Sequence, residues 1–533
     1  MRLGGSRSTL DGGIVMLEKD NVHFFDTSGL SETPGIRGRC NADYLTKALK
    51  ARFPGEEFTV TRAEINDTGK YKSNVNILVK LLWAKTDLEG LPPFCHVVIN
   101  HKTGTAEENI IIWSPLAWND RFAGTAGGGS STGSYSHITV PNNVSRGWTI
   151  PYALINGFTA AITDAGNEQY GNTWGQNQQT GEIYWDRIEN WRARSTHDMT
   201  VFGKAVAEIL HDRPVRYAYM NGGSGGGRQS MAEAQEFPED YDGIWACCPA
   251  INWAKFIICG FWPQAVMRSY GCPLHPKKLE YFADALQASV GGPDAYYRLE
   301  QHPVKFDPVV LVGQKTKAGV ITQTDAEIMQ KIWEGPRRKD GTPYWFGFQP
   351  GQKNWNKIIP IGWFYYPLFK KWPKPFPLAD IWARWVTGDP KQNFDKITME
   401  ELEPLFDASS EKFPTCNIDN ADLRPFAAHG GKLMIDHGWD DPLIPTMGTI
   451  DYYQRMVQIV GGREQADKFC RLYITPGDNH GNCVGNGPGI TQTDGIKALI
   501  NWVENGIAPQ EIRVVQVDKK TGKTICERTQ KPY

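Results

Sequence analysis

The sequence of 533 residues lacks an excess of charge of either sign, and it lacks long apolar runs. Its 57 basic and 59 acidic residues leave a net charge of -2, which gives no field to attract nucleic acid or an anionic membrane surface. No segment approaches the roughly 18 uninterrupted apolar residues that a membrane-spanning helix needs. We therefore expect neither a nucleic acid nor a membrane as partner, and the oligomeric state stays open.

Cysteine is also sparse. Ten cysteines are ordinary usage for this length and do not indicate a disulfide scaffold. The first eleven residues contain no sustained apolar run of the kind that a secretory signal peptide has. These two features favour a reducing, cytoplasmic location.

Metal-binding motifs are missing as well. Neither His-Glu-x-x-His nor Cys-x-x-Cys occurs in the sequence. The adjacent pair Cys247 and Cys248 follows an apolar run that begins at Gly243, a context typical of buried strand packing. We therefore predict no metal ligands and no cofactor.

The most informative motif present is Gly-x-Ser-x-Gly at residues 222–226. A β-prone run, 217–221, precedes it, and a helix-forming segment, 229–235, follows it. That context is typical of a nucleophile elbow, a tight turn that holds a serine hydroxyl above a sheet. Glycines suit such a turn because side chains would collide where strand and helix cross closely. The pattern predicts Ser224 as a nucleophile, with a plain glycine-rich loop as the alternative.

A nucleophilic serine needs a base, and the base needs an orienting acid. Two later predicted strands, 432–435 and 469–474, are followed by loops that supply an aspartate and then a histidine, the chain order of α/β-hydrolases. We predict Asp441 as the acid and His480 as the base. Spacing alone leaves competitors open: Asp436, Asp440 and Asp451 for the acid, and His437 beside the acid loop.

A second glycine-rich loop, 124–133, follows the predicted strand 109–113 and a short connection. Glycines let backbone N–H groups approach a developing oxyanion closely. The run does not fit Gly-x-Gly-x-x-Gly, and no Gly-Lys-Ser/Thr ending follows it, so a phosphate cradle is disfavoured. This loop is therefore a candidate oxyanion hole, with a flexible loop as the alternative.

The organisation of the chain predicts an α/β fold with an insertion. Residues 40–254 and 401–533 alternate β-like runs with amphipathic helices such as 197–210, which predicts a mainly parallel sheet with crossover helices. Residues 255–400 are denser in aromatics and broken by prolines, as expected of an inserted lid domain. Residues 1–39 form an N-terminal extension. Most lid aromatics should form the lid's own core, but a roof of flat apolar walls suits an aromatic acyl group.

At these motifs the chain resembles the tannase and feruloyl esterase family of α/β-hydrolases. The similarity extends over most of the sequence, and the blocks around Ser224 and Asp441 are the most specific. The resemblance implies that Asp441 is the catalytic acid. It also implies an oxyanion hole made by the amide of Gly225 with the glycine run that includes Gly127 and Gly128. The implied activity is hydrolysis of phenolic esters such as gallates and ferulates, with a small aromatic ester as partner.

The chain departs from the family pattern in its disulfides. Family members usually have a cysteine just before the nucleophile and another just after the histidine, and these form a disulfide. Here those positions are Gly223 and Gly481. Cys40 and Cys95 fall where another family disulfide usually sits, and the sequence leaves open whether they pair.

A second departure concerns calcium. The family lid usually carries a calcium loop rich in aspartate and glycine. The corresponding stretch here offers Asp284 and Asp294 with little between them, whereas calcium takes roughly six to eight oxygen ligands. We therefore predict that the family calcium site is absent.

Two other classes of function stay open. The same three residues could serve a peptidase or an enzyme that cleaves a carbon–carbon bond beside a carbonyl. A non-catalytic ligand-binding protein of this fold is less favoured, because such proteins usually lose a residue of the triad and none is lost here.

Overall fold

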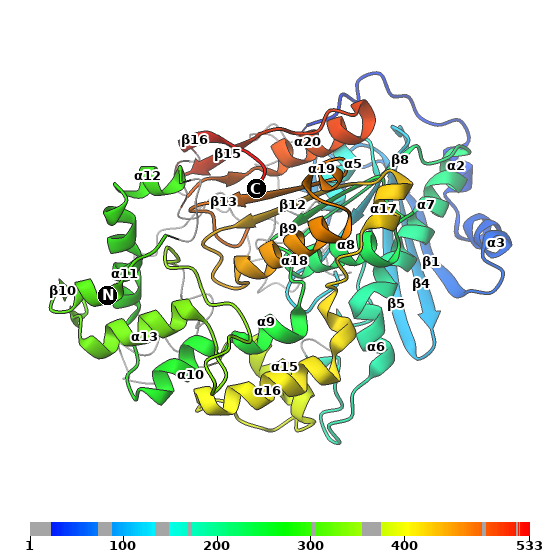
Figure 1. Cartoon of the computed structure of the whole chain (residues 1–533). Coiled ribbons are helices and arrows are strands. Elements are labelled where there is room, and N and C mark those ends of the chain that lie inside the picture. Colours follow the sequence, from blue (N-terminus) through cyan, green and yellow to red (C-terminus); the bar gives the residue numbers. More distant parts are fainter. Residues whose placement is uncertain are drawn as a thin grey trace, which may run out of the picture.

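The computed structural model describes most of the chain: residues 23–72, 88–133, 149–168, 173–299, 304–353, 372, 375–481, 487–518, 521 and 523–533. These residues form a central sheet covered by helices, with a large helical layer beside it (Figure 1). None of the helices in these ranges combines the length and apolarity needed to cross a bilayer.

The main sheet has the strand order β1-β4-β5-β7-β6-β8-β9-β12-β13. From β7 to β13 neighbouring strands are parallel, and β1, β4, β5 and β7 pair antiparallel. The inner strands are buried along almost their whole length, as expected of a parallel sheet covered on both faces. The predicted fold class is confirmed. The strand bounds are β1 (Glu57–Asn66), β4 (Phe94–Thr103), β5 (Ala106–Pro115), β6 (Arg121–Thr125), β7 (Thr159–Thr163), β8 (Tyr217–Gly223), β9 (Gly243–Cys247), β12 (Lys432–Gly438) and β13 (Cys470–Thr475).

Helices cover both faces of this sheet. One face packs against α3 (Ala42–Arg52), α7 (Ser195–His211), α8 (Gly225–Glu236) and α18 (Thr446–Ile459), and the other against α5 (Ile150–Ile155) and α20 (Gln492–Asn505). Each face has its own apolar core. Helix α7 corresponds to the amphipathic segment expected at 197–210. A small sheet of β14 (Gly489–Ile490), β15 (Ile512–Val517) and β16 (Thr524–Gln530) lies at the C-terminal end of the chain.

The segment between β9 and β12 is mostly helical and lies to the left of and below the sheet in Figure 1. It contains α9 (Trp253–Cys259), α10 (Trp262–Ser269), α11 (Pro276–Ser289), α12 (Pro293–Tyr297), α13 (Gln323–Glu334), α15 (Pro377–Thr387) and α16 (Met399–Lys412). All of these helices except α12 contribute to a separate core, in which Trp382 packs against the rings of Trp253 and Trp385. The buried tyrosines of α12 belong to the core on the α7 and α8 face of the sheet. The layer continues through α16, past residue 400, because Leu402 and Phe406 are part of that core. The aromatic residues between positions 355 and 369, which the sequence assigns to the lid, fall outside the described residues.

Cys40 and Cys95 form a disulfide, which answers the question that the sequence left open. The bond links the start of the α3 region to β4. Disulfides persist mainly in oxidising compartments, so this bond and the expected cytoplasmic location point in opposite directions. The location therefore stays a prediction.

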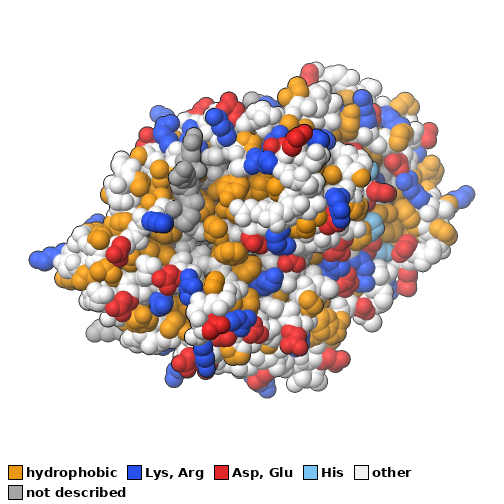
Figure 2. Space-filling model, viewed as in Figure 1, with side chains coloured by type: hydrophobic (Ala, Val, Ile, Leu, Met, Phe, Trp, Pro, Cys, Tyr) orange, Lys and Arg blue, Asp and Glu red, His pale blue; other side chains and the backbone are white. Residues whose placement is uncertain are grey.

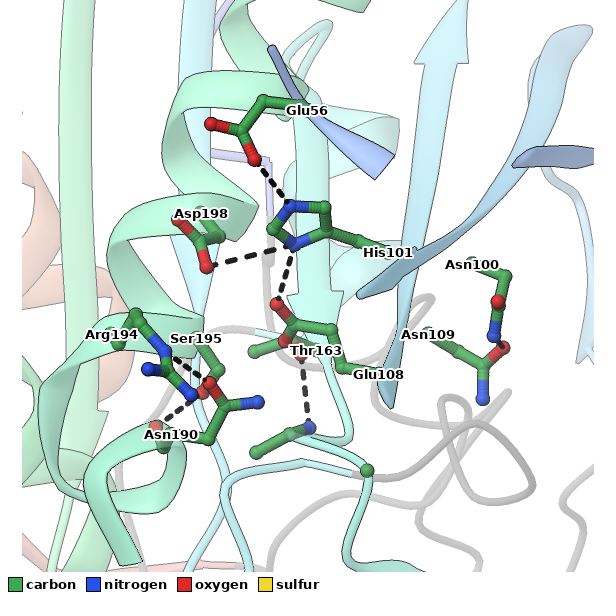
Figure 3. A network of polar contacts seen from close by, with 12 residues as sticks. Glu56, Asn100, His101, Glu108, Asn109, Thr163, Asn190, Arg194, Ser195 and Asp198 are labelled. Atoms are coloured by element: carbon green, nitrogen blue, oxygen red, sulfur yellow. Dashed lines mark hydrogen bonds and ion pairs between the residues drawn. The ribbon is translucent and has the colours of Figure 1, made fainter. Parts of the chain in front are cut away.

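A buried polar network, which the sequence did not reveal, joins β4, β5 and α7 (Figure 3). His101 Nε2 lies 3.1 Å from Glu56, and its Nδ1 lies 3.2 Å from Glu108 and 3.6 Å from Asp198. The Thr163 hydroxyl donates a hydrogen bond to Glu108. Burial lowers the pKa of His101, but the hydrogen bonds and charges of the three carboxylates outweigh this and raise it to about 9. Burial raises the pKa of Glu108 to about 7.

The surface carries both signs of charge in close alternation. On the face shown in Figure 2, blue and red side chains are interspersed, with apolar side chains between them. This distribution agrees with the net charge of -2. It gives no support to a nucleic-acid or membrane partner on this face, and the predicted absence of both partners stays a prediction.

Candidate active site

Ser224 lies in a tight turn between β8 and α8, as the motif predicted. Its backbone has φ 62° and ψ -122°, a left-handed conformation that costs energy for a residue other than glycine. A side chain at Gly222 would place Cβ 2.5 Å from the carbonyl oxygen of Gly226, and one at Gly226 would place it 2.6 Å from that of Gly127. Gly222 is therefore required for β8 and α8 to meet this closely, and Gly226 for the glycine-rich loop at 124–133 to pack against α8. The turn presents the serine hydroxyl at the strand end.

The three predicted side chains meet at the carboxyl ends of β8, β12 and β13. His480 Nε2 lies 2.8 Å from the Ser224 hydroxyl oxygen, and His480 Nδ1 lies 2.6 Å from Asp441 Oδ2. Asp441 and His480 are buried, whereas Ser224 keeps 7% of its surface exposed. An ionised carboxylate can only accept hydrogen bonds, so Nδ1–H donates to Asp441 and Nε2 is left to accept the serine proton. The arrangement can activate a hydroxyl for nucleophilic attack.

Asp441 is held by four hydrogen bonds. Its Oδ1 accepts from the backbone N–H groups of Leu443 at 2.7 Å and Ile444 at 3.0 Å, and its Oδ2 accepts from both His480 and His437. Burial alone would raise the pKa of Asp441. The electrostatic interaction with the His480 ring and the hydrogen bonds from both histidines outweigh burial and hold this pKa well below its usual range. The carboxylate therefore stays ionised, as an orienting acid must.

The competing aspartates have other partners. Asp440 accepts a hydrogen bond from the Tyr296 hydroxyl at 2.7 Å, and burial raises its pKa to about 7. Asp436 accepts from a buried tryptophan indole, and Asp451 forms an ion pair with an arginine on the same helix. Of the four candidates, Asp441 is the one that contacts the histidine. The geometry thus makes a choice that spacing could not make.

His437 has a place in the site that the sequence interpretation missed. The sequence offers it as a competitor for the base, but its Nε2 lies 3.0 Å from Asp441 Oδ2 and its Nδ1 lies 2.9 Å from the Thr449 hydroxyl. The ring is buried and contacts the same carboxylate oxygen as His480. The signal that could have identified it is the spacing of four residues between His437 and Asp441 at the end of a buried strand.

The candidate oxyanion hole lies where the glycine-rich loop meets α8. The short strand β6, which directly precedes this loop, was not predicted from the sequence. A Cβ on Gly225 would lie 2.3 Å from the Gly129 carbonyl oxygen and 3.2 Å from the Gly128 carbonyl carbon, so the two glycine segments are in contact. The N–H of Gly127, however, donates to the Gln229 side chain at 3.2 Å. Of the three predicted donors, this leaves the amides of Gly225 and Gly128.

The positions that depart from the family pattern have their own roles. Gly481 has φ 67°, a left-handed conformation in which a cysteine would be strained. Asp284 lies 2.6 Å from the Lys353 ammonium, and Asp294 lies 3.2 Å from the Arg298 guanidinium. Each of these two carboxylates therefore already faces a cation. The absence of calcium stays a prediction.

A cavity of about 680 Å³ lies in the helical layer, lined by aromatic residues that include Trp333, Trp345 and Phe346. Its other walls come from α13 and from Met447 on α18. No member of the Ser224, His480 and Asp441 triad lines it. We therefore do not assign this cavity as the acyl pocket, despite its size and aromatic walls.

The sheet is mainly parallel, with a serine in a nucleophile elbow and an aspartate and a histidine after later strands. This combination defines a serine hydrolase of the α/β-hydrolase class. Residues 95–532 match the family model "Tannase and feruloyl esterase". The chain belongs to the tannase and feruloyl esterase family, as the resemblance implied, and is a carboxylic ester hydrolase.

Known relatives agree with this membership. The chain is 31% identical over 457 residues to a probable feruloyl esterase of Arthroderma benhamiae, an alignment that covers 81% of this chain and 80% of that protein. It is 28% identical over 509 residues to the mono(2-hydroxyethyl) terephthalate hydrolase of Piscinibacter sakaiensis, covering 80% and 79% of the two chains. The solved tannin acyl hydrolase from Aspergillus niger is similar with a TM-score of 0.75 at 18% identity, covering 95% of this chain and 93% of that one. That last likeness supports the fold.

Proposed function

We propose that the protein hydrolyses esters of phenolic acids through an acyl-enzyme on Ser224, with His480 as general base and acid and Asp441 as the orienting acid. The observation that carries the proposal is the unbroken hydrogen-bond chain from Ser224 through His480 to Asp441, with distances of 2.8 and 2.6 Å. These three residues come from distant parts of the sequence and meet at one edge of the sheet.

In the acylation half, the Ser224 oxygen attacks the ester carbonyl carbon and its proton passes to His480 Nε2. The ionised Asp441 stabilises the imidazolium that forms. The carbonyl oxygen becomes an oxyanion, which the amides of Gly225 and Gly128 receive. The tetrahedral intermediate then collapses, the bond to the alcohol oxygen breaks, and His480 gives its proton to the leaving alcohol.

In the deacylation half, a water molecule takes the place of the alcohol. His480 Nε2 accepts a proton from this water, whose oxygen attacks the acyl carbon. The second tetrahedral intermediate uses the same oxyanion donors. Its collapse releases the carboxylic acid, and His480 returns the proton to the Ser224 oxygen.

The aromatic character of the acyl group is supported by the relatives. The proteins that this chain resembles are named for feruloyl esters, tannin and a terephthalate ester. The alignments with the first two of these proteins cover most of the chain. A phenolic acyl group is therefore the substrate class favoured over a peptide or a diketone.

The test is a substrate panel of methyl ferulate, methyl gallate, an aliphatic methyl ester, a peptide and a diketone. Wild type, Ser224→Ala and the control Ser230→Ala are assayed side by side. Ser230 is buried on α8, the helix that follows Ser224, and its hydroxyl donates to the carbonyl of Gly226. We expect turnover of the phenolic esters, loss of several orders of magnitude in Ser224→Ala and near-normal rates in the control.

A fluorophosphonate adduct confined to Ser224 would agree with this assignment. Preference for the peptide or the diketone would refute the substrate class. Full activity in Ser224→Ala would refute the nucleophile, and no turnover of any substrate together with no adduct would indicate a ligand-binding protein.

A further inference from the structure

A cysteine thiol lies beside the histidine and the aspartate of the proposed triad. Cys248 directly follows β9, and its Sγ, a ring nitrogen of His480 and a carboxylate oxygen of Asp441 all lie within 4.8 Å of one another. All three side chains are buried. Thiolate sulfur, imidazole nitrogen and carboxylate oxygen are the ligands that zinc takes in proteins.

The backbone fixes the thiol at this place. Cys248 has φ 33°, in the left-handed region, and its N–H donates to the Asp436 carbonyl oxygen at 2.6 Å. Because β9 lies between β8 and β12 in the sheet, the residue after β9 is held between the serine loop and the aspartate loop. The cysteine one position earlier, Cys247, lies within β9, and its Sγ accepts a hydrogen bond from the Asn221 amide.

The separations are compatible with a metal ion. With Zn–S of about 2.3 Å and Zn–N of about 2.0 Å, tetrahedral geometry puts sulfur and nitrogen about 3.5 Å apart. The sulfur and nitrogen are at most 4.8 Å apart in the structure, so the two atoms must approach each other by at most about 1.3 Å to bind one zinc ion. The fourth position would stay open, because the protein supplies three ligands.

The charges also match. A thiolate and a carboxylate together offset the charge of one divalent cation, and the histidine binds as neutral imidazole. Binding therefore releases one proton, from the thiol, and transfers no electrons. The ion would enter by the route that substrate must take to Ser224.

We propose that Cys248, His480 and Asp441 form an inhibitory site for zinc and similar thiophilic divalent cations. A metal on His480 Nδ1 would replace the hydrogen bond to Asp441. A metal on Nε2 would block the acceptance of the serine proton. Either mode stops the proton relay, so bound metal abolishes acyl transfer. This proposal departs from the expectation that the sequence holds no metal ligands, because Cys248 is a ligand here; the ion would act as an inhibitor and not as a cofactor.

Two other groups in the described part of the chain bring a histidine and carboxylates within 4.8 Å of one another, and both lack sulfur. One is the His101 network, in which Glu56 lies against the second ring nitrogen. The other joins His197, Glu233 and Asp240. They are the alternative places where zinc could bind, and the experiment includes them.

The experiment has a spectroscopic arm that needs no enzyme activity. Cobalt(II) is titrated into metal-free protein, and the near-ultraviolet thiolate-to-cobalt charge-transfer band is recorded for wild type, Cys248→Ala, Cys248→Ser and the matched control Cys247→Ala. We expect the band at one equivalent in wild type and Cys247→Ala, and its loss in both Cys248 variants. Absence of the band in folded wild type would overturn the proposal even if the esterase assignment holds.

The kinetic arm measures hydrolysis of methyl ferulate against zinc concentration, each variant relative to its own metal-free rate. It rests on the proposed function. We expect inhibition of wild type and Cys247→Ala that chelator reverses, and at least a tenfold higher half-inhibitory zinc concentration in Cys248→Ala and Cys248→Ser. Equal sensitivity of the Cys248 variants, or relief of inhibition by His197→Ala or His101→Gln, would place the inhibitory metal elsewhere.

Discussion

The His101 network makes the stability of the protein depend on pH in a direction that can be worked out from the structure. His101 on β4 is enclosed by Glu56, Glu108 and Asp198, and its side chain is only 2% exposed. Its pKa is raised to about 9 in the folded protein, from an ordinary value of 6.5. The perturbation is His101→Gln, which keeps a polar side chain and removes the titration.

A base whose pKa is raised by folding stabilises the fold while it is protonated in both states. That contribution is complete below pH 6.5 and is lost as the pH rises through about 9. At 1.36 kcal/mol for each pKa unit, it amounts to about 3 kcal/mol. Burial raises the pKa of Glu108 to about 7, so its protonation also stabilises the fold at low pH and is lost as the pH rises. Both groups therefore lower the free energy of unfolding as the pH rises.

The assay is urea unfolding between pH 6.5 and 9, with the free energy of unfolding plotted against pH. His96→Gln is the matched control, because His96 is buried on the same strand and burial lowers its pKa to about 3, so it is neutral throughout this range. We expect wild type and His96→Gln to lose about 3 kcal/mol over the range and His101→Gln to show a much flatter profile. Equal slopes in all three proteins would refute the reasoning.

Two further predictions concern the site and one concerns the scaffold. His437→Phe removes a hydrogen bond to the buried Asp441 carboxylate, and such a bond is worth about 1.5–3 kcal/mol. Steady-state kinetics should therefore show kcat lowered roughly 10- to 100-fold. An unchanged kcat would mean that His480 alone orients the acid. Gly225→Ala would drive Cβ to 2.3 Å from the Gly129 carbonyl oxygen, and we expect kcat on methyl ferulate to fall by about 10²–10³ with the fold retained by circular dichroism; a normal kcat would move the oxyanion hole elsewhere. Cys95→Ser opens a disulfide across a sequence separation of 55, and thermal or urea unfolding should show a loss of about 4 kcal/mol; no loss would mean that the bond does not constrain the unfolded chain.

The parts of the site that could be predicted from sequence are those that short segments specify. The nucleophile turn is one, because the glycine at 222 is forced by the close approach of β8 and α8 within a few residues, although the glycine at 226 faces the Gly127 carbonyl of a distant loop. The strands before Asp441 and His480 are others, because buried parallel strands have continuous apolar sequences. These local signals placed three loops at strand ends, and the order of the strands in the sheet then brings the loops together.

Choices among neighbours could not be predicted in the same way. Asp440 and Asp441 are adjacent in sequence, yet one faces Tyr296 and the other faces His480. Which carboxylate points to the histidine depends on how the loop after β12 packs against the loop after β13. The engagement of the Gly127 amide by Gln229 is likewise a contact over about a hundred residues, and no local pattern indicates it.

The His101 network and the end of the helical layer were missed for a related reason. The network joins side chains from β4, β5 and α7, each of which is unremarkable in its own segment. The helical layer extends through α16 because that helix packs its apolar face on α9 and α10, while its composition is as polar as that of an ordinary surface helix. Tertiary contacts, which the amino-acid pattern of one segment does not contain, decide both cases.

The same sheet topology that assembles the triad also explains why Cys248 matters. In a parallel sheet, the residue after each strand lies at a common edge, and β8, β9, β12 and β13 are consecutive neighbours. Three of these four ends carry Ser224, Asp441 and His480. The fourth end, after β9, carries Cys248, whose thiol lies within 4.8 Å of a ring nitrogen of His480 and a carboxylate oxygen of Asp441. A thiol at that position adds a soft ligand next to an imidazole and a carboxylate, and the proposed sensitivity to thiophilic metals depends on this placement.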